Sequence, residues 1–98
     1  MTSTAEKISR TVTVGNRMGL HGRPAAQLVM MLAAFPEANL TLAREDDPDR
    51  AADCRSVLSM LVLAASKGTR LILSGEGKDI NAARDAVANY FSKNFDEE

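Results

Sequence analysis

The sequence predicts an α+β domain, an open-faced β-sandwich in which one sheet carries its helices on a single face. Two observations lead to this fold class. Segments that alternate β-branched with polar residues recur along the chain, and the segments between them carry one apolar stripe at helical spacing. The chain has 98 residues, enough for one hydrophobic core. We therefore expect a single domain over 1–98, with flexible tails at 1–7 and 94–98.

The first half of the chain predicts a strand, a helix and a second strand. Residues 8–14 are rich in β-branched side chains and alternate, as in a strand, and the glycines in 15–19 predict a loop after it. Pro24 suits the first turn of a helix, where its missing N–H leaves nothing unpaired, and Pro36 ends that helix. Residues 39–43 alternate again and predict the second strand. The apolar stripe of the helix is Leu28, Val29, Leu32 and Phe35.

The second half predicts a loop, a helix, a strand and a last helix. Segment 44–53 is charged and contains Pro48, so we expect an exposed loop, with a short third strand hidden near 51–54. Residues 56–65 predict a helix with Ser56 as its N-cap and Gly68 past its end. A strand over 69–74, a turn over 75–77 and a helix capped by Asp79 complete the order β-α-β-(β)-α-β-α. The last helix buries a stripe of Ile80, Ala83, Val87, Tyr90 and Phe91.

The composition excludes several classes of protein. The chain has 12 Lys and Arg against 13 Asp and Glu, a net charge of −1, and 4% aromatic residues, which argues against a nucleic-acid binder. Cys54 and His21 are each alone of their kind, which excludes an intramolecular disulfide and a Cys/His metal site. No apolar run approaches the ~20 residues of a membrane helix, and 1–10 has no signal-peptide core. We expect a cytoplasmic protein without a metal or cofactor.

The candidate for chemistry is His21, at the entry of the first predicted helix. Free N–H groups and the helix dipole favour a phosphate there and keep the imidazole neutral and nucleophilic near pH 7. Arg23 offers a planar guanidinium for phosphate oxygens, and Gly22 adds no side chain to obstruct it. The alternative is that His21 is only a capping or surface residue. Cys54 is interpreted as a small buried hydrophobe.

Residues 19–26, Gly-Leu-His-Gly-Arg-Pro-Ala-Ala, resemble the active-site signature of HPr, the histidine phosphocarrier family of the bacterial phosphoenolpyruvate-dependent phosphotransferase system. The resemblance continues at Arg55-Ser56-Val57, at Ser66-Lys67-Gly68 and at Gly77, and spans residues 11 to about 91. It implies four antiparallel strands with three helices on one side, which supplies the third strand. Segment 44–50 is longer than the usual loop of the family, so the third strand is hard to align.

The resemblance also implies a function. His21 would accept a phosphoryl group on Nδ1 from phospho-Enzyme I and pass it to an Enzyme IIA, and Arg23 would stabilise the phosphate. Such a protein is a stoichiometric carrier rather than an enzyme, and we expect it to be a monomer. Ser56 falls on the family's regulatory serine, a substrate of HPr kinase, although the same residue can serve as an N-cap alone.

The second predicted helix is apolar on every side, although one helix on one sheet can bury only one of them. We expect Met60, Leu63 and Ala64 to face inward, and Leu58, Leu61 and Val62 to form an exposed patch of the kind that marks an interface. The alternative is that segment 44–53 covers them. Arg17, Arg23 and Arg55 would form a basic rim around this patch. The predicted partner-binding residues are Met18, Leu20, Gly22, Arg55, Val57, Leu58 and Leu61.

Two alternatives to the sugar-transport carrier stay open. Segments 16–19 and 90–98 resemble NPr, the nitrogen-related branch of the same family, which uses the same phosphohistidine chemistry in regulation. The other alternative is a small α+β ligand-binding module in which His21 is structural and is never phosphorylated.

Overall fold

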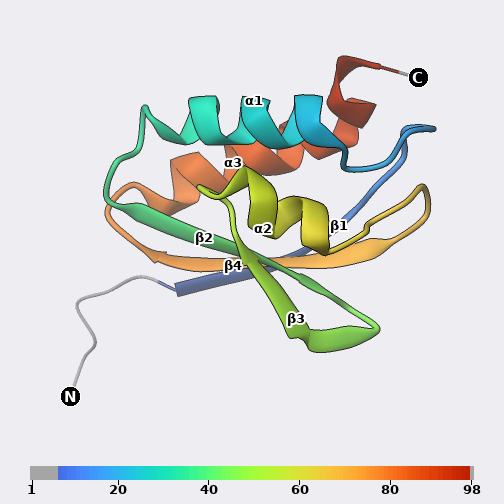
Figure 1. Ribbon diagram of the computed structural model, residues 1–98. Helices are drawn as coiled ribbons and strands as arrows, with labels where there is room; N and C mark the ends of the chain where they lie inside the picture. Colours follow the sequence, from blue (N-terminus) through green and yellow to red (C-terminus); the bar gives the residue numbers. More distant parts are fainter. Residues whose placement is uncertain (1–6, 98) are drawn as a thin grey trace.

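The computed structural model describes residues 7–97 and confirms the predicted fold class (Figure 1). The strands are β1 (Lys7–Thr13), β2 (Ala38–Arg44), β3 (Asp47–Asp53) and β4 (Arg70–Gly77). They form one antiparallel sheet in the order β1-β4-β2-β3. The helices α1 (Gly22–Leu32), α2 (Val57–Val62) and α3 (Ile80–Ser92) lie together on one face of this sheet, and a short 3-10 turn, η1 (Asn94–Asp96), follows α3.

The core lies between the sheet and the helices, and the predicted stripes supply most of it. Leu28 and Leu32 of α1 are fully buried, whereas Val29 and Phe35 are partly buried against the core. In α3, Tyr90 is only half-buried and the other four residues of the predicted stripe are buried. Alternate residues of β2 and β4, namely Leu40, Leu42, Leu71 and Leu73, close the core from below.

The predicted loop over 44–53 is wrong in its backbone. A tight turn at 45–46 joins β2 to β3, with a register shift between Ala43 and Arg44. Only Ala52 of β3 is buried, so this edge strand lacks the apolar alternation that reveals a half-buried strand. Pro48 is compatible with it, because an edge strand does not need every N–H for its ladder.

Two predicted boundaries also differ from the structure, and one predicted cap lacks its hydrogen bond. The helix expected over 56–65 ends at Val62, and Ala64, rather than Gly68, takes a left-handed backbone just after it, with φ 52°. The turn expected over 75–77 is a continuation of β4, where a Cβ on Gly75 would lie 2.2 Å from the Asn39 carbonyl oxygen. Asp79 holds the N-cap position of α3 but makes no side-chain cap hydrogen bond.

Residues 94–97 differ from the expected flexible tail. Phe95 is 4% exposed, and its ring contacts Phe91 and Tyr90 at centroid distances of 4.8 and 5.1 Å. Asn94, Phe95 and Asp96 all have positive φ angles, so the backbone turns back on itself after α3. Figure 1 shows this segment (red) at the same end of the molecule as the loop before α1 (blue). Residues 1–6 and 98 lie outside the described chain, and Lys7 begins β1.

Candidate functional site

His21 occupies the N-cap of α1. Its backbone is extended, with φ −93° and ψ −172°, and its carbonyl oxygen accepts the first helical hydrogen bond, from the Ala25 N–H at 3.1 Å. The N–H groups of Gly22 and Arg23 therefore precede the helical hydrogen-bond ladder, and Pro24 has none to offer. Gly22 is exposed, and a Cβ added there would meet nothing within 4 Å. The helix thus begins with two donors beside an open surface.

The loop before His21 is held by close backbone contacts. Gly19 has φ +74°, and a Cβ there would lie 2.6 Å from the Ala65 carbonyl oxygen, so this position requires glycine. The Leu20 N–H donates to the same Ala65 oxygen at 2.9 Å. Leu20 is itself 4% exposed: its side chain belongs to the core and holds the loop, so it offers almost no surface for the partner contact predicted for it.

The His21 ring contacts a carboxylate that the sequence analysis assigned to a tail. His21 Nε2 lies 2.9 Å from Glu97 Oε1 and 3.2 Å from Glu97 Oε2. A carboxylate only accepts hydrogen bonds, so the proton of the neutral ring is on Nε2, and Nδ1 carries the free electron pair. The side chain of His21 is 27% exposed and that of Glu97 21%. The ring is therefore held in place and still reachable from solvent.

Asn16 fixes the carboxylate from the other side. It is fully buried, and its Nδ2 donates to Glu97 Oε1 at 2.7 Å and to the Gly19 carbonyl oxygen at 2.8 Å. Both partners are acceptors, so the amide orientation is determined by the contacts. Asn16 Oδ1 is buried without a hydrogen-bond partner in the described chain. Hydrogen bonds from His21, the larger effect, and from Asn16 lower the pKa of Glu97 below its ordinary value.

Sequence reasoning missed Asn16 and Glu97 as site residues. They are separated by 81 positions, and neither belongs to an apolar pattern that places it in space. The available signal was Phe95, an aromatic residue within an acidic ending, because a buried ring at that position draws the following carboxylate onto the fold.

Arg23 lies on the exposed side of the same site. The site is a shallow hollow lined by Arg17, Met18, His21, Arg23 and Glu97. No hydrogen bond or ion pair ties the Arg23 guanidinium to another residue within 7–97, so its donors are available to a bound group. The hollow therefore combines two guanidinium groups with the imidazole, and it lies at the start of α1.

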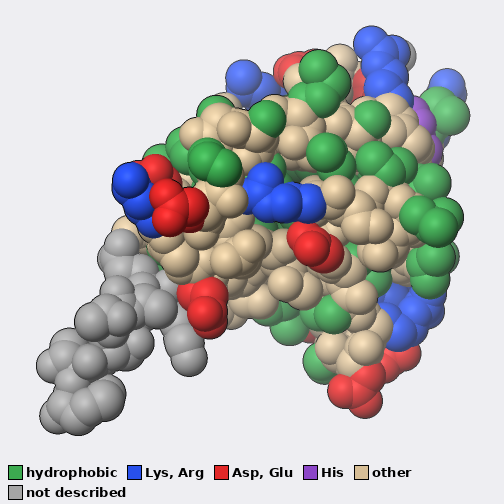
Figure 2. Space-filling model, turned by 60° about the vertical axis from the view of Figure 1, so that its left-hand side comes forward, with side chains coloured by type: hydrophobic (Ala, Val, Ile, Leu, Met, Phe, Trp, Pro, Cys, Tyr) green, Lys and Arg blue, Asp and Glu red, His purple; other side chains and the backbone are tan. Residues whose placement is uncertain are grey.

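The α2 surface agrees with part of the prediction. Leu58 is 73% exposed, Val62 65% and Leu61 39%, whereas Met60 and Leu63 are buried. Ala64, predicted to face inward, is exposed. Segment 44–53 does not cover this patch; instead Arg44 and Arg50 donate to carbonyl oxygens at the end of α2. Figure 2 shows hydrophobic side chains gathered along one edge of the molecule, beside the histidine.

Arg55 does not belong to the basic rim in which it was predicted. Its guanidinium donates to the carbonyl oxygens of Leu32 at 3.0 Å, Phe35 at 2.7 Å and Ala38 at 2.6 Å. These contacts satisfy carbonyl groups at and beyond the end of α1, so the guanidinium is already engaged inside the fold rather than facing a partner. The other predicted partner-binding residues divide into Met18, which is 67% exposed, and Val57, which is half-buried.

Ser56 is the N-cap of α2, as predicted. Its Oγ accepts from the Ser59 N–H at 3.1 Å and donates to Ser59 Oγ at 2.9 Å. Cys54, two residues earlier, is fully buried, and burial raises the pKa of its thiol to about 12, which agrees with its interpretation as a small hydrophobe.

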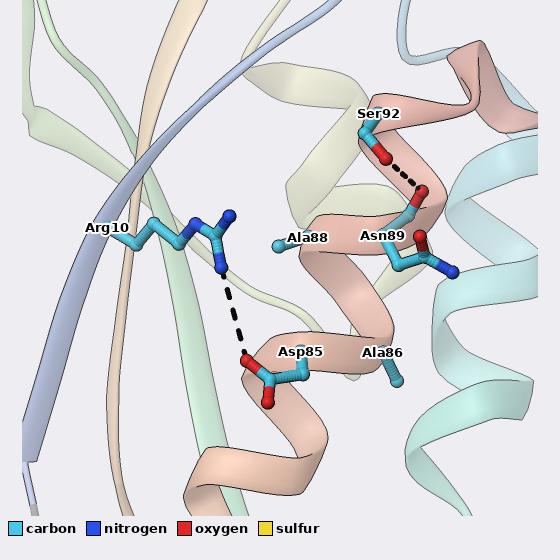
Figure 3. A pocket seen from close by; sticks show the side chains of 6 residues that line it. All are labelled: Arg10, Asp85, Ala86, Ala88, Asn89 and Ser92. Atoms are coloured by element: carbon cyan, nitrogen blue, oxygen red, sulfur yellow. Dashed lines mark hydrogen bonds and ion pairs between the residues drawn. The ribbon is translucent and has the colours of Figure 1, made fainter.

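The remaining surface offers less chemistry. Figure 3 shows a hollow between β1 and α3, where Arg10 reaches toward Asp85 at 4.0 Å and Ser92 donates to the Asn89 carbonyl oxygen. Asp85 also pairs with Arg84 at 2.9 Å, so the charges there offset one another. Within residues 7–97 there is no cluster of His, Cys, Asp and Glu suited to a metal ion. None of the helices within residues 7–97 is long and apolar enough to span a bilayer.

The chain is similar to known phosphocarriers along nearly its whole length. The family described as "PTS HPr component phosphorylation site" matches residues 8–93. The phosphocarrier protein NPr of Shewanella violacea is 35% identical over 91 residues, 93% of this chain and 96% of that protein. The phosphocarrier protein HPr of Pseudomonas putida is 35% identical over 89 residues, 91% of this chain and 96% of that protein.

Solved structures show the same similarity. The crystal structure of HPr-C-His from Thermoanaerobacter tengcongensis superposes with a TM-score of 0.81 at 27% sequence identity, covering 93% of this chain and 98% of that one. A match over nearly the whole sequence, the same four-stranded sheet with its three helices, and a histidine at the N-cap of α1 all lead to one assignment. The chain belongs to the HPr family of the phosphotransferase system.

Proposed function

We propose that this phosphocarrier of the phosphotransferase system carries its phosphoryl group on His21 Nδ1. The observation that carries the proposal is the state of the ring. Nε2 is engaged by Glu97, and Nδ1 is left with a free electron pair in a hollow with Arg23. A nucleophile must have an unprotonated, reachable atom, and Nδ1 is the ring nitrogen that Glu97 leaves unengaged, on a side chain that is 27% exposed.

The surroundings of the ring suit a phosphate that must also leave. Two backbone N–H groups at the start of α1 and the Arg23 guanidinium offer charge-assisted hydrogen bonds to phosphate oxygens. These groups lie on an exposed surface, so water and a partner protein also reach the phosphate. A site with few donors and open access holds the group without trapping it, which is what a carrier requires.

We further propose the order of transfer that the family implies. Phospho-Enzyme I supplies the phosphoryl group and an Enzyme IIA accepts it, and both transfers take place in the cytoplasm. Because the chain itself carries the group between the two proteins, it acts as a stoichiometric carrier and not as an enzyme. Leu58, Leu61 and Met18 form the apolar contact surface for these partners, and Arg17 and Arg23 form its basic rim. Leu20 and Arg55 are left out of this surface because the fold already uses them.

Labelling with Enzyme I and labelled phosphoenolpyruvate tests the proposal. His21 is the only histidine, so phosphate that is labile in acid and stable in base can reside on this residue alone. His21→Ala should take up no such label and should keep the fold. Arg23→Lys, which keeps the charge and loses the planar fork, should still be labelled, but more slowly. Label retained by His21→Ala would refute the assignment, and so would an unlabelled wild-type chain.

We propose Ser56 as a regulatory phosphorylation site as well. Its hydroxyl is half-buried at the start of α2, next to the exposed Leu58, so a phosphate there adds about −1.5 to −2 charges beside the proposed docking surface. Ser56→Asp tests this: it should preserve the cap and slow phosphorylation by Enzyme I. Equal rates for Ser56→Asp and wild type, together with no phosphorylation by an HPr kinase, would leave Ser56 as a cap only.

A specific observation favours the nitrogen branch as the second candidate. The two segments that resemble NPr, 16–19 and 90–98, meet at the site through Asn16 and Glu97. The relatives include an NPr and an HPr at the same 35% identity. Transfer rates from sugar-type and nitrogen-type Enzyme I, and to the corresponding IIA proteins, decide between the branches. If the chain were instead a ligand-binding module, neither donor would label it, and a ligand would raise its free energy of unfolding.

A further inference from the structure

We infer that Glu97 is a positioning residue which keeps one proton on His21 Nε2 through the whole phosphoryl cycle. This inference rests on the proposed function of His21 and adds a residue that the signature around the histidine does not contain. Glu97 does not touch the phosphoryl group in this proposal; it acts through the imidazole ring.

The geometry supports a fixed ring rather than a chance surface contact. Both carboxylate oxygens lie within hydrogen-bond distance of Nε2, at 2.9 and 3.2 Å. The carboxylate is itself anchored by Asn16 Nδ2 at 2.7 Å, and that amide is fully buried. The backbone of Glu97 is also held, because its N–H donates to the Asn94 carbonyl oxygen at 3.0 Å. A buried donor, a carboxylate and the ring thus form one continuous chain of contacts.

The charges around the ring support the same role. Among the residues lining the hollow, Arg17 and Arg23 are cationic and Glu97 is the anion. The two arginines can face the phosphate, whereas Glu97 faces the opposite nitrogen of the ring. Its hydrogen bonds also lower the pKa of Glu97, so the carboxylate stays ionised where a carrier works.

The proton balance of the transfer explains what this contact does. In the first step, the electron pair on Nδ1 attacks phosphorus in the phosphohistidine of the donor. The P–N bond of the donor breaks, its electron pair stays on the donor nitrogen, and the new P–Nδ1 bond forms. His21 then carries a phosphoryl group on Nδ1 and its original proton on Nε2, so its ring is formally an imidazolium. Glu97 stabilises that cation by a charge-assisted hydrogen bond.

In the second step the phosphoryl group leaves His21, and again no proton moves. The acceptor nucleophile attacks phosphorus, the P–Nδ1 bond breaks, and its electron pair returns to Nδ1. Because Nε2 has kept its proton, the group that leaves is a neutral imidazole. Without that proton it would be an imidazolate anion, a far poorer leaving group. The ring returns to the tautomer that began the cycle, with Nδ1 free for the next phosphoryl group. Glu97 therefore prepares both steps by holding a single tautomer.

Three variants test the inference. Glu97→Ala removes the acceptor, Glu97→Gln keeps the size but replaces the charge with an amide, and Asp96→Asn removes an equal charge from the neighbouring exposed residue. Imidazole 15N NMR at about pH 9, above the ordinary titration range of histidine, reports which ring nitrogen carries the proton. We expect the Nε2-protonated form in wild type and Asp96→Asn, and a mixture of tautomers in both Glu97 variants.

The rates complete the test. Loss of a charge-assisted hydrogen bond to a partly exposed ring should slow phosphorylation by Enzyme I about tenfold in the Glu97 variants. Phosphoramidate, a small donor that needs no docking surface, should show the same ordering. If the Glu97 variants keep the tautomer and the rates of wild type, the inference is wrong. If only the rate with Enzyme I falls, Glu97 acts in docking and the inference is also wrong. Failure of the proposed function differs from both, because wild type itself would then take up no label.

Discussion

Replacing Phe95 with Ala should release the C-terminal turn and with it the carboxylate on His21. Phe95 is 4% exposed, and its ring packs on Phe91 and Tyr90. Removing a buried Phe from a core usually lowers the free energy of unfolding by about 3–5 kcal/mol. We expect a smaller loss here, because the turn lies at the end of the described chain and can detach while the sheet and the three helices stay folded.

The expected magnitude follows from what the turn contributes when it is docked. Residues 94–96 have φ angles of 53°, 58° and 58°, a conformation that side chains other than glycine disfavour. Strain of about 1 kcal/mol per residue must be offset by the Phe95 packing and the Glu97 contacts. Without the ring the docked form loses its main support. The free energy of unfolding should therefore fall only by the docking free energy, about 1–2 kcal/mol.

Urea unfolding gives the global loss, and amide hydrogen exchange shows where the structure opens. We expect faster exchange in residues 94–97, little change in β2 and β4, and loss of the single His21 tautomer in 15N NMR. Phe95→Leu, which keeps most of the apolar contact, should restore the turn. A loss of 3–5 kcal/mol in one cooperative transition, without faster local exchange, would refute independent detachment. An unchanged free energy of unfolding would show that the ring supports nothing.

Three further predictions follow from the other contacts. Ser56→Ala should lower the free energy of unfolding by about 1 kcal/mol in urea titrations, because it removes the cap on the Ser59 N–H, whereas Ser56→Asp should not; equal stability of the two would contradict the capping role. The lowered pKa of Glu97 means that the unfolded chain binds this proton more readily, so its contribution to stability is present above the ordinary value of 4.5 and is lost as pH falls through the lowered one. The side-chain amide shifts of Asn16, whose Nδ2 donates to Glu97, should therefore change below pH 4.5 in wild type and not in Glu97→Gln. Leu58→Ser, at a side chain that is 73% exposed, should slow phosphorylation by Enzyme I while the free energy of unfolding stays within about 0.5 kcal/mol, and an unchanged rate would remove Leu58 from the docking surface.

The elements with strong periodicity could be predicted from the sequence, because the pattern that reveals each of them lies within a few neighbouring residues. The apolar stripes of α1 and α3 and the cap at Ser56 depend on residues three or four positions apart, which a reader of the sequence can see. The position of His21 at the start of α1 followed from Pro24 in the same way. These features fix the fold class and the first turn on which the site is built.

The features that were missed depend on contacts between distant residues. β3 is an edge strand with one buried side chain, so no alternation marks it. Arg55 was assigned to the surface because of its charge, although carbonyl groups left open at the end of α1 recruit it inward. Glu97 reaches His21 across 76 positions through a left-handed turn, and no spacing rule describes that path. The sequence analysis thus misplaced two charged side chains. Backbone carbonyl groups are the partners of Arg55, and a turn of the backbone brings Glu97 to its partner His21.

The edge at β3 has a consequence for how copies of this protein meet. β3 pairs only with β2, so its outer side is an unpaired border of the sheet. Its first four residues, Asp47-Pro48-Asp49-Arg50, are all exposed, and Pro48 offers no amide hydrogen. An incoming strand would find a gap in its ladder and would have to desolvate carboxylates, both of which oppose edge-to-edge growth into larger aggregates. The features that hid this strand from sequence reasoning thus also oppose pairing with a second copy at this edge of the sheet.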